Sequence, residues 1–112
     1  MMLVTAVVQP TILTQVQLAL ATHDVKGMTV TECSGYARQH GHVETYRGAE
    51  YTIDFIAKVR LEVLASDEQA DEIVSLIADA ARTGQVGDGK IWTTPLGHVV
   101  RIRTGECDED AI

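Results

Sequence analysis

A long alternation with a period of two residues, over residues 53–63, constrains the fold more than any other feature. Every second residue of this run is apolar, and Lys58, Arg60 and Glu62 stand between them. Successive side chains of a strand point to opposite faces, so the spacing predicts one long strand with an apolar and a polar face. Helices would cover the apolar face. A ligand or another copy of the chain would cover the other face, and an oligomer is the simpler solution.

The residues before this run predict a strand, a helix and a second strand. Residues 2–9 are apolar and β-branched and stop at Pro10, as a buried strand does. In residues 12–23 one helical face is formed by Ile12, Val16, Ala19, Leu20 and His23, and Gly27 ends that pattern. Residues 28–36, rich in Thr and Val, predict the second strand.

The residues after the run predict a helix and two short strands. Ser66 and Gln69 have the spacing of a capping box, and apolar residues repeat at helical spacing until Gly84. Strand patterns follow at 91–94 and 98–103. The order β-α-β-β-α-β with an extra short C-terminal strand predicts an α+β, ferredoxin-like fold with both helices on one face of the sheet.

Length, charge and cysteine content narrow the class of protein. We expect one domain, residues 1–112, without a signal peptide or an apolar stretch of the roughly 20 residues that a membrane span needs. Cys33 and Cys107 are too few and too far apart for a disulfide framework, which favours a cytoplasmic protein. The formal charge is −7, and removing four acidic residues near the end leaves −3: Glu106, Asp108, Glu109 and Asp110. An acidic body predicts no nucleic-acid partner.

The segment between the second and third strands, residues 37–52, has no period. Connections of this length are uncommon in compact domains and are either functional or disordered, and we favour a function. His40 and His42 have the spacing His-x-His, but no third ligand stands nearby, so we do not expect a structural metal site. The carbonyl of Gln39 is suited to complete the coordination of a magnesium ion whose other ligands are phosphates.

Residues 84–90 have the G-x-x-x-x-G-K spacing of a phosphate-binding P-loop without its context. A P-loop follows a strand, opens a helix and has Ser or Thr after the Lys, whereas this turn follows a helix and has Ile91 there. Gly87, Gly89 and Lys90 are still suited to turn N–H groups and a positive charge toward an anion. An ordinary helix-to-strand turn is the alternative.

Other cations could complete such an anion site. Arg101 and Arg103 are two residues apart on the last predicted strand, so both guanidinium groups would leave the same face and could grip one polyphosphate. An exposed face with two arginines is the alternative. Lys58 could hold a ligand carboxylate, or it could be a solvated strand lysine. Neither the turn nor the arginine pair supplies a nucleophile or a general base.

Three separated motifs resemble one family: Arg-Gly-Ala-Glu-Tyr at 47–51, Ala-Ala-Arg-Thr-Gly leading into Gly-Asp-Gly-Lys at 80–90, and Val-Arg-Ile-Arg-Thr-Gly-Glu at 100–106. At this spacing the sequence is similar to the PII nitrogen-regulatory signal-transduction proteins. The resemblance implies a homotrimer, not an enzyme, that binds ATP or ADP in clefts between subunits and contacts targets through a T-loop at about 37–54. The implied nucleotide-binding residues are Thr29, Arg38, Glu62, Leu64, Gly87, Asp88, Gly89, Lys90, Arg101 and Arg103.

The resemblance further implies a site for 2-oxoglutarate at the base of the T-loop, formed once ATP and Mg²⁺ are bound. Gln39 would complete the magnesium shell and Lys58 would pair with the distal carboxylate. Occupancy of this site would rearrange the T-loop and so change which targets it contacts. The implied residues of the 2-oxoglutarate site are Ala37, Gln39, His40, Gly41 and Lys58.

Modification and partners also follow from the resemblance. Tyr51 would be the hydroxyl that a nucleotidylyltransferase uridylylates or adenylylates, or else a partner contact. The implied targets are the ammonium transporter, which would recruit the protein to the membrane, and nitrogen-metabolism enzymes, with control of glutamine synthetase. The family commonly has Gly at Ala37, an aromatic residue at Thr11 and Lys at three further positions, Gln9, His40 and Gln85. These departures favour nucleotide binding over the 2-oxoglutarate response.

Two alternatives belong to other classes of protein. A small phosphatase or nucleotide hydrolase could share this fold, although Asp88 is the only acid in the phosphate turn. An RNA-recognition module could also share it, but such modules stack bases on sheet aromatics, and this acidic chain has only Phe55, Trp92 and three tyrosines.

Overall fold

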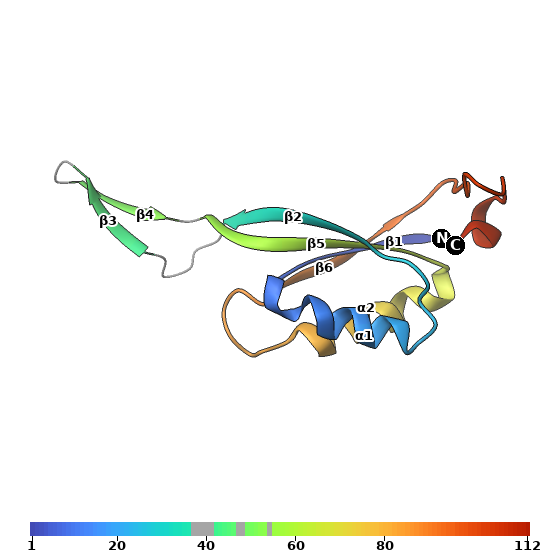
Figure 1. Cartoon of the computed structure of the whole chain (residues 1–112), viewed down its shortest axis with the longest axis horizontal. Helices are drawn as coiled ribbons and strands as arrows, with labels where there is room; N and C mark the ends of the chain where they lie inside the picture. The colour runs from blue at the N-terminus through green and yellow to red at the C-terminus, as the bar shows by residue number, and fades with distance from the viewer. Residues whose placement is uncertain (37–41, 47–48, 54) are drawn as a thin grey trace.

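The computed structural model describes residues 1–36 and 55–112, together with the backbone course of 42–46 and 49–53. Its main sheet has the strand order β2-β5-β1-β6 with antiparallel pairs throughout. Helices α1 and α2 lie against one face of this sheet (Figure 1). This arrangement confirms the predicted α+β, ferredoxin-like fold. The elements are β1 (Met2–Val8), α1 (Leu13–Ala21), β2 (Thr29–Tyr36), β5 (Phe55–Ala65), α2 (Asp67–Ala81) and β6 (Gly89–Pro95).

The alternation that dominated the sequence becomes strand β5, with one face buried against the helices. Val59, Leu61 and Val63 are buried there, whereas Arg60 on the opposite face is exposed. The apolar residues predicted for the two helices supply the other side of the core, with Val16 and Leu20 from α1. From α2 the buried residues are Ala70, Ile73, Ile77 and Ala81. The hydrophobic core therefore lies between the sheet and the two helices.

The boundaries of both helices have local causes. The N–H of Gln69 donates to Ser66 Oγ at 3.2 Å, which confirms the capping box at the start of α2. A 3₁₀ turn, η1 (Pro10–Ile12), precedes α1, so this α-helix begins at Leu13 and not at residue 12 as predicted. After α2, Gly84 has φ +85°, a left-handed conformation that favours glycine and turns the chain toward β6.

The prediction of a final strand at 98–103 is wrong. These residues form no strand, and Val100 makes only an isolated bridge with Cys107. The chain instead folds back on itself, because the N–H of Arg101 donates to the carbonyl of Glu106 at 2.8 Å and the N–H of Gly105 to that of Arg101 at 2.8 Å. A short 3₁₀ helix, η2 (Asp108–Ala111), follows this turn.

The long segment between β2 and β5 contains a hairpin that its lack of period did not predict. Strands β3 (His42–Tyr46) and β4 (Ala49–Ile53) pair antiparallel as a separate two-stranded sheet. Residue 51 is part of β4, opposite residue 44. Five predicted site residues lie outside the residues that the structure describes: Ala37, Arg38, Gln39, His40 and Gly41.

Candidate functional site

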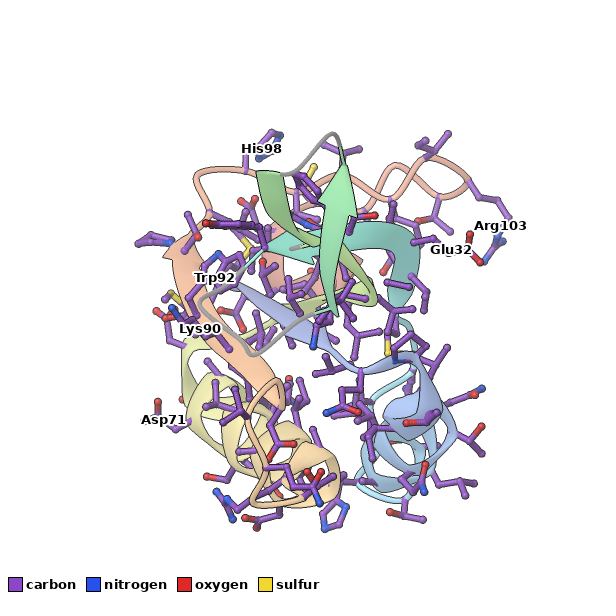
Figure 2. All side chains as sticks on the ribbon, turned by 90° about the vertical axis from the view of Figure 1, so that its left-hand side faces the viewer. Glu32, Asp71, Lys90, Trp92, His98 and Arg103 are labelled. Carbon is purple, nitrogen blue, oxygen red and sulfur yellow. The ribbon has the colours of Figure 1, made fainter. Side chains whose placement is uncertain are left out.

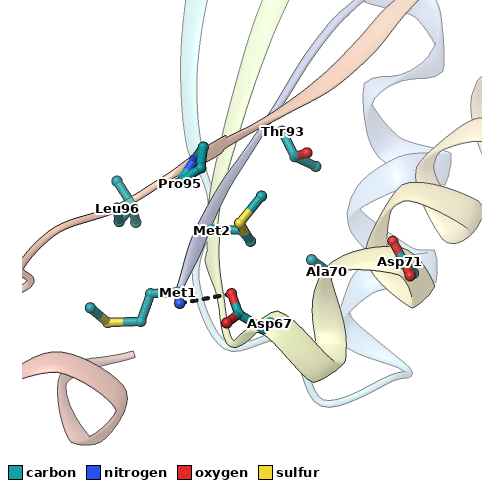
Figure 3. Close-up of a pocket in the computed structure, with 8 residues that line it drawn as sticks. All are labelled: Met1, Met2, Asp67, Ala70, Asp71, Thr93, Pro95 and Leu96. Atoms are coloured by element: carbon teal, nitrogen blue, oxygen red, sulfur yellow. Dashed lines mark hydrogen bonds and ion pairs between the residues drawn. The ribbon is translucent and has the colours of Figure 1, made fainter.

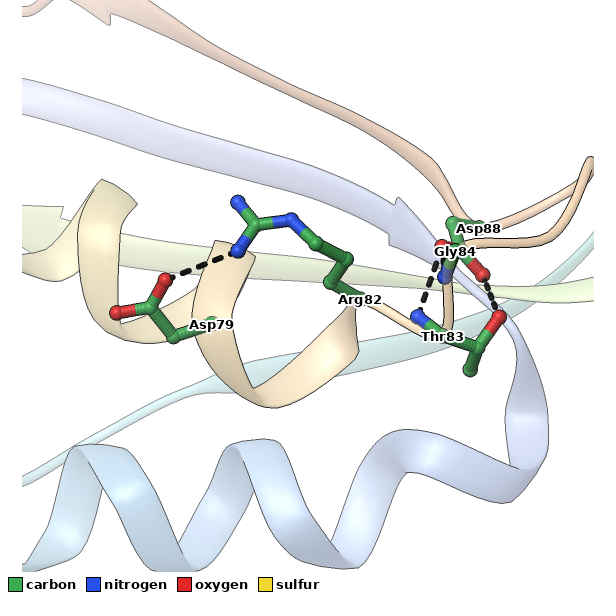
Figure 4. Close-up of polar contacts among 5 residues, drawn as sticks. All are labelled: Asp79, Arg82, Thr83, Gly84 and Asp88. Atoms are coloured by element: carbon green, nitrogen blue, oxygen red, sulfur yellow. Dashed lines mark hydrogen bonds and ion pairs between the residues drawn. The ribbon is translucent and has the colours of Figure 1, made fainter.

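The predicted phosphate turn is closed by the carboxylate of Asp88. It accepts hydrogen bonds from the N–H groups of Thr83, at 2.8 Å, and Gly84, at 2.9 Å, and from the hydroxyl of Thr83 (Figure 4). These bonds, the hydroxyl bond of Thr83 first, lower the pKa of Asp88. Asp88 therefore ties the two ends of the 83–88 loop together as an ionised acceptor.

Two glycines of this turn have conformations that other residues rarely adopt. Gly87 has φ +100° and Gly89 has φ +107°. A Cβ at Gly89 would also collide with the carbonyl oxygen of Val7, because β6 begins there beside β1. The Gly-x-Gly spacing thus has a backbone reason that holds with or without a bound anion.

Lys58 meets the same turn from strand β5. Its Nζ donates to the carbonyl oxygen of Gly87 at 2.5 Å, and only 9% of the residue is exposed. Gly35 on the neighbouring strand leaves room for it, since a Cβ there would lie 3.2 Å from Lys58 Cγ. The alternative of a solvated strand lysine is therefore wrong.

The turn and Lys58 line one cavity of about 400 Å³. Gly87, Gly89 and Lys90 contribute its phosphate-binding candidates, and Trp92 is part of its apolar wall. Two lysines and two glycines thus line one space, a composition that suits an anionic ligand.

A second cavity, of about 440 Å³, collects four of the residues that the family resemblance implies for nucleotide binding. Thr29, Glu62 and Leu64 line it together with Arg101, and residues 111 and 112 form another part of its wall. A sheet strand, its neighbour and the C-terminal segment thus meet around one space, although they are far apart in the sequence.

The two predicted arginines do not form one fork. Arg101 Nη1 donates to Glu106 Oε1 at 3.0 Å. Arg103 lies in the turn that follows, so the shared strand face expected for the pair does not exist. Lys90 and Arg103 lie on opposite sides of the molecule in the view of Figure 2. One chain therefore does not bring its predicted phosphate ligands together.

The open face of the sheet carries a polar cluster beside exposed apolar side chains. The Arg60 guanidinium lies 5.9 Å from the ring centroid of Trp92, and Arg60 Nε lies 3.5 Å from Glu62 Oε1. Trp92 and Ile56 are each 41% exposed. This face has no helix over it in Figure 1.

Another cavity, of about 530 Å³, lies at the start of α2 and is lined by none of the residues predicted for ligand binding (Figure 3). The Met1 amino group donates to Asp67 there at 2.8 Å, and this bond raises the pKa of the amino group. Among the residues that the structure describes, no group of three or more His, Cys, Asp or Glu side chains is arranged to hold a metal ion. No helix in the described part of the chain is long and apolar enough to span a membrane.

Sequence reasoning missed Thr83, Gly35 and Glu106. Thr83 left a local signal, because Thr and Asp side chains in turns form hydrogen bonds to backbone groups a few residues away. The contacts of Gly35 with Lys58 depend on strand pairing and left no signal in the sequence.

Comparison with known proteins decides the family. The model of the family "Nitrogen regulatory protein P-II" matches residues 1–106. The chain belongs to the P-II family. It is 48% identical over 112 residues, all of both chains, to nitrogen regulatory protein GlnK of Escherichia coli K12. It is 50% identical over 107 residues, 96% of both chains, to nitrogen regulatory protein P-II of Azospirillum brasilense.

A third relative agrees with this assignment. Nitrogen regulatory protein P-II of Pasteurella multocida is 49% identical over 107 residues, 96% of both chains. P-II proteins are signalling regulators and not enzymes, which confirms the expectation drawn from the motifs and removes the hydrolase alternative. The chain is a GlnK-like P-II protein with a signalling role in nitrogen regulation.

Proposed function

We propose that this P-II protein senses ATP or ADP together with 2-oxoglutarate, and that it regulates nitrogen assimilation as a cytoplasmic homotrimer. Residues 1–112 would form one domain, with residues 37–54 as the T-loop. One observation carries this proposal. The residues expected to bind the nucleotide line two separate cavities, one around Glu62 and one around Lys90.

Each cavity suits one half of an adenine nucleotide. In the first, Thr29 and Glu62 offer hydrogen-bonding groups beside the apolar Leu64, as an adenine ring requires. In the second, the backbone of Gly87 and Gly89 and the ammonium of Lys90 suit a polyphosphate. A nucleotide would use the first cavity of one subunit and the second of its neighbour, with Arg101 and Arg103 closing the phosphates. Arg38 would add a contact, and Asp88 would act by holding the turn.

The open sheet face supports the homotrimer. A sheet with one uncovered face that carries Trp92 and Ile56 gains free energy when that face is covered by other copies of the chain. The same association would bring the two kinds of cavity together. In this proposal a complete nucleotide site therefore exists only where two subunits associate.

The effector 2-oxoglutarate would bind beside Lys58, whose ammonium would pair with the distal carboxylate. Ala37, His40 and Gly41 would form the rest of that site. Gln39 would complete the coordination of Mg²⁺ between ATP and the effector, because the two anions repel each other without a cation. Since Gln39 begins the T-loop, effector binding and T-loop conformation would be linked.

The T-loop would carry the output. Its proposed targets are the ammonium transporter and enzymes of nitrogen metabolism. The transporter would recruit the protein to the membrane, and the control of enzymes would include that of glutamine synthetase. A nucleotidylyltransferase would modify Tyr51, adding charge and bulk to the loop. We propose no nucleic-acid partner, because the chain has a net charge of −7.

Calorimetry and sedimentation test the central claims. We expect ATP and ADP to bind to a particle of three chains, and 2-oxoglutarate to bind only when both ATP and Mg²⁺ are present. Titration of 2-oxoglutarate with ATP and EDTA is the control. A monomeric particle, or no binding at millimolar nucleotide, would contradict the proposal.

Mass spectrometry tests the modification. We expect protein from nitrogen-starved and ammonium-shocked cells to differ by one nucleotidyl mass on the peptide that contains Tyr51. The Tyr51→Phe protein should show no increment. An unchanged mass of the wild-type peptide in both conditions would remove modification from the proposal.

A further inference from the structure

Residues 111 and 112, at the end of the segment 108–112, form part of the wall of the cavity that Thr29, Glu62 and Leu64 also line. Ala111 and Ile112 line that cavity and are half-buried. Their position depends on the turn that brings the chain back after β6, since they belong to no strand of the main sheet. Whatever holds residues 108–112 therefore shapes the cavity.

Asp108 fastens this segment to the residues that follow β6. Its N–H donates to the carbonyl of Val99 at 2.7 Å. Its Oδ1 accepts from the N–H of Val99 at 3.1 Å and lies 2.8 Å from His98 Nδ1. The carboxylate of Asp108 thus joins the two ends of the 98–108 turn. Both side chains remain accessible, since that of His98 is 64% exposed and that of Asp108 is 49% exposed.

The backbone conformation of Asp108 is unfavourable, so its hydrogen bonds must offset a conformational free-energy cost. Asp108 has φ +56°, a left-handed conformation that is uncommon outside glycine and that Asn and Asp tolerate best. The hydrogen bond from the Val99 N–H, followed by that from His98, lowers the pKa of Asp108. The carboxylate is thus held in its ionised, accepting form.

We propose that Asp108 and His98 are positioning residues that hold residues 108–112 against the Glu62 cavity and thereby set its affinity for adenine nucleotides. The inference rests on the proposed function in one respect, the identity of the ligand. Release of Asp108 would free Ala111 and Ile112 to leave the cavity, which would lose part of its apolar wall. A ligand held there would then dissociate faster.

Two substitutions of Asp108 distinguish the effect of losing its carboxylate from the effect of straining its backbone. Asp108→Gly removes both side-chain contacts but accepts φ +56° without strain, whereas Asp108→Asn keeps an acceptor oxygen and also tolerates this φ. Asp110→Gly is the matched control, because it makes the same change two residues further along η2. In the full-length protein we expect Asp108→Gly to weaken ATP binding about three- to tenfold, the scale of one or two lost hydrogen bonds. Asp108→Asn and Asp110→Gly should stay within about twofold of wild type.

Substitution of His98 tests the second partner. His98→Ala should weaken ATP binding less than Asp108→Gly does, and His98→Asn should restore affinity, because the Asn amide nitrogen occupies nearly the place of Nδ1. A purely structural loss would not be rescued by this smaller side chain.

Hydrogen exchange of the nucleotide-free proteins gives a result that does not depend on the ligand. We expect the Val99 amide, which donates to the Asp108 carboxylate, to exchange at least about tenfold faster in Asp108→Gly than in wild type or Asp110→Gly. Equal exchange, or equal ATP affinity of Asp108→Gly and wild type, would overturn the inference while the proposed function stands. A wild-type protein that binds no nucleotide would overturn both the proposed function and the effect on affinity, and exchange would still decide whether Asp108 holds the segment.

Discussion

The ammonium of Lys58 donates a 2.5 Å hydrogen bond to the carbonyl oxygen of Gly87, across 29 positions of sequence. This bond joins the middle of β5 to the turn before β6. The turn is also closed from within by Asp88, so two charged side chains hold it from two directions. The ammonium has three N–H donors, so this bond leaves two of them for a carboxylate ligand.

Lys58→Met should loosen the turn while preserving the apolar stem of the side chain. A hydrogen bond from a charged group contributes about 1.5–3 kcal/mol, and its loss leaves the Gly87 carbonyl without this donor. We expect faster amide exchange over residues 84–90 and, if the proposed function is correct, weaker binding of 2-oxoglutarate. Lys26→Met, at an exposed position, is the control for amide exchange. Unchanged exchange in Lys58→Met would show that Asp88 alone holds the turn.

The 83–88 loop should open in acid. The pKa of Asp88 is lowered in the folded state, so its hydrogen bonds stabilise the loop at neutral pH. This contribution is present above about pH 3.9, the ordinary pKa of an Asp, and is lost as the pH falls through the lowered value. Amide protection factors of Thr83 and Gly84, followed by NMR, should fall as the pH drops from about 3.9 through the lowered pKa of Asp88. In Asp88→Asn they should be lower at pH 7 and should not show this transition.

Gly89→Ala should destabilise the fold strongly. The residue would carry φ +107° and its Cβ would meet the carbonyl oxygen of Val7, so β6 would have to shift away from β1. We expect the free energy of unfolding to fall by at least about 2 kcal/mol in denaturant titrations. Gly97→Ala has open space around its Cβ and should change stability by less than about 0.5 kcal/mol. Equal stability of the two variants would contradict this account of the turn.

Thr5→Val should stabilise the protein. Thr5 is 1% exposed, and its hydroxyl has no hydrogen-bond partner among the residues that the structure describes. Removing a buried, unpaired hydroxyl at nearly constant volume should raise the free energy of unfolding by about 1 kcal/mol. Thr94→Val, at an exposed position of β6, should have little effect. A loss of stability in Thr5→Val would contradict this expectation.

Arg103→Ala should weaken nucleotide binding if the proposed function is correct. Loss of one charge-assisted bond to a phosphate would raise the dissociation constant about tenfold or more, on the order of 1.5–3 kcal/mol. Calorimetry with ATP measures the change. Arg82→Ala removes an exposed guanidinium that pairs with Asp79 at 3.3 Å and should bind ATP like wild type. Equal affinity in both variants would exclude Arg103 from the nucleotide site.

Local patterns in the sequence predicted most elements of the fold correctly. The alternation around Leu61 became β5, and the Ser66 and Gln69 pair begins α2. Such features are readable because strand and helix impose fixed side-chain periods, and because caps involve residues three positions apart. The prediction failed at 98–103, where a strand-like composition pairs with residues a few positions on and not with the sheet.

The candidate site, like the fold, could be predicted from the sequence only in part. The family, the layers of the fold and the glycine turn could be predicted from the sequence, because each depends on residues that lie close together along the chain. Three relationships became visible only in the folded chain: Lys58 is buried against Gly87, Arg101 pairs with Glu106, and the adenine and phosphate candidates line different cavities. Those relationships depend on how strands pair and how the chain returns after β6, and neither is encoded in any local period.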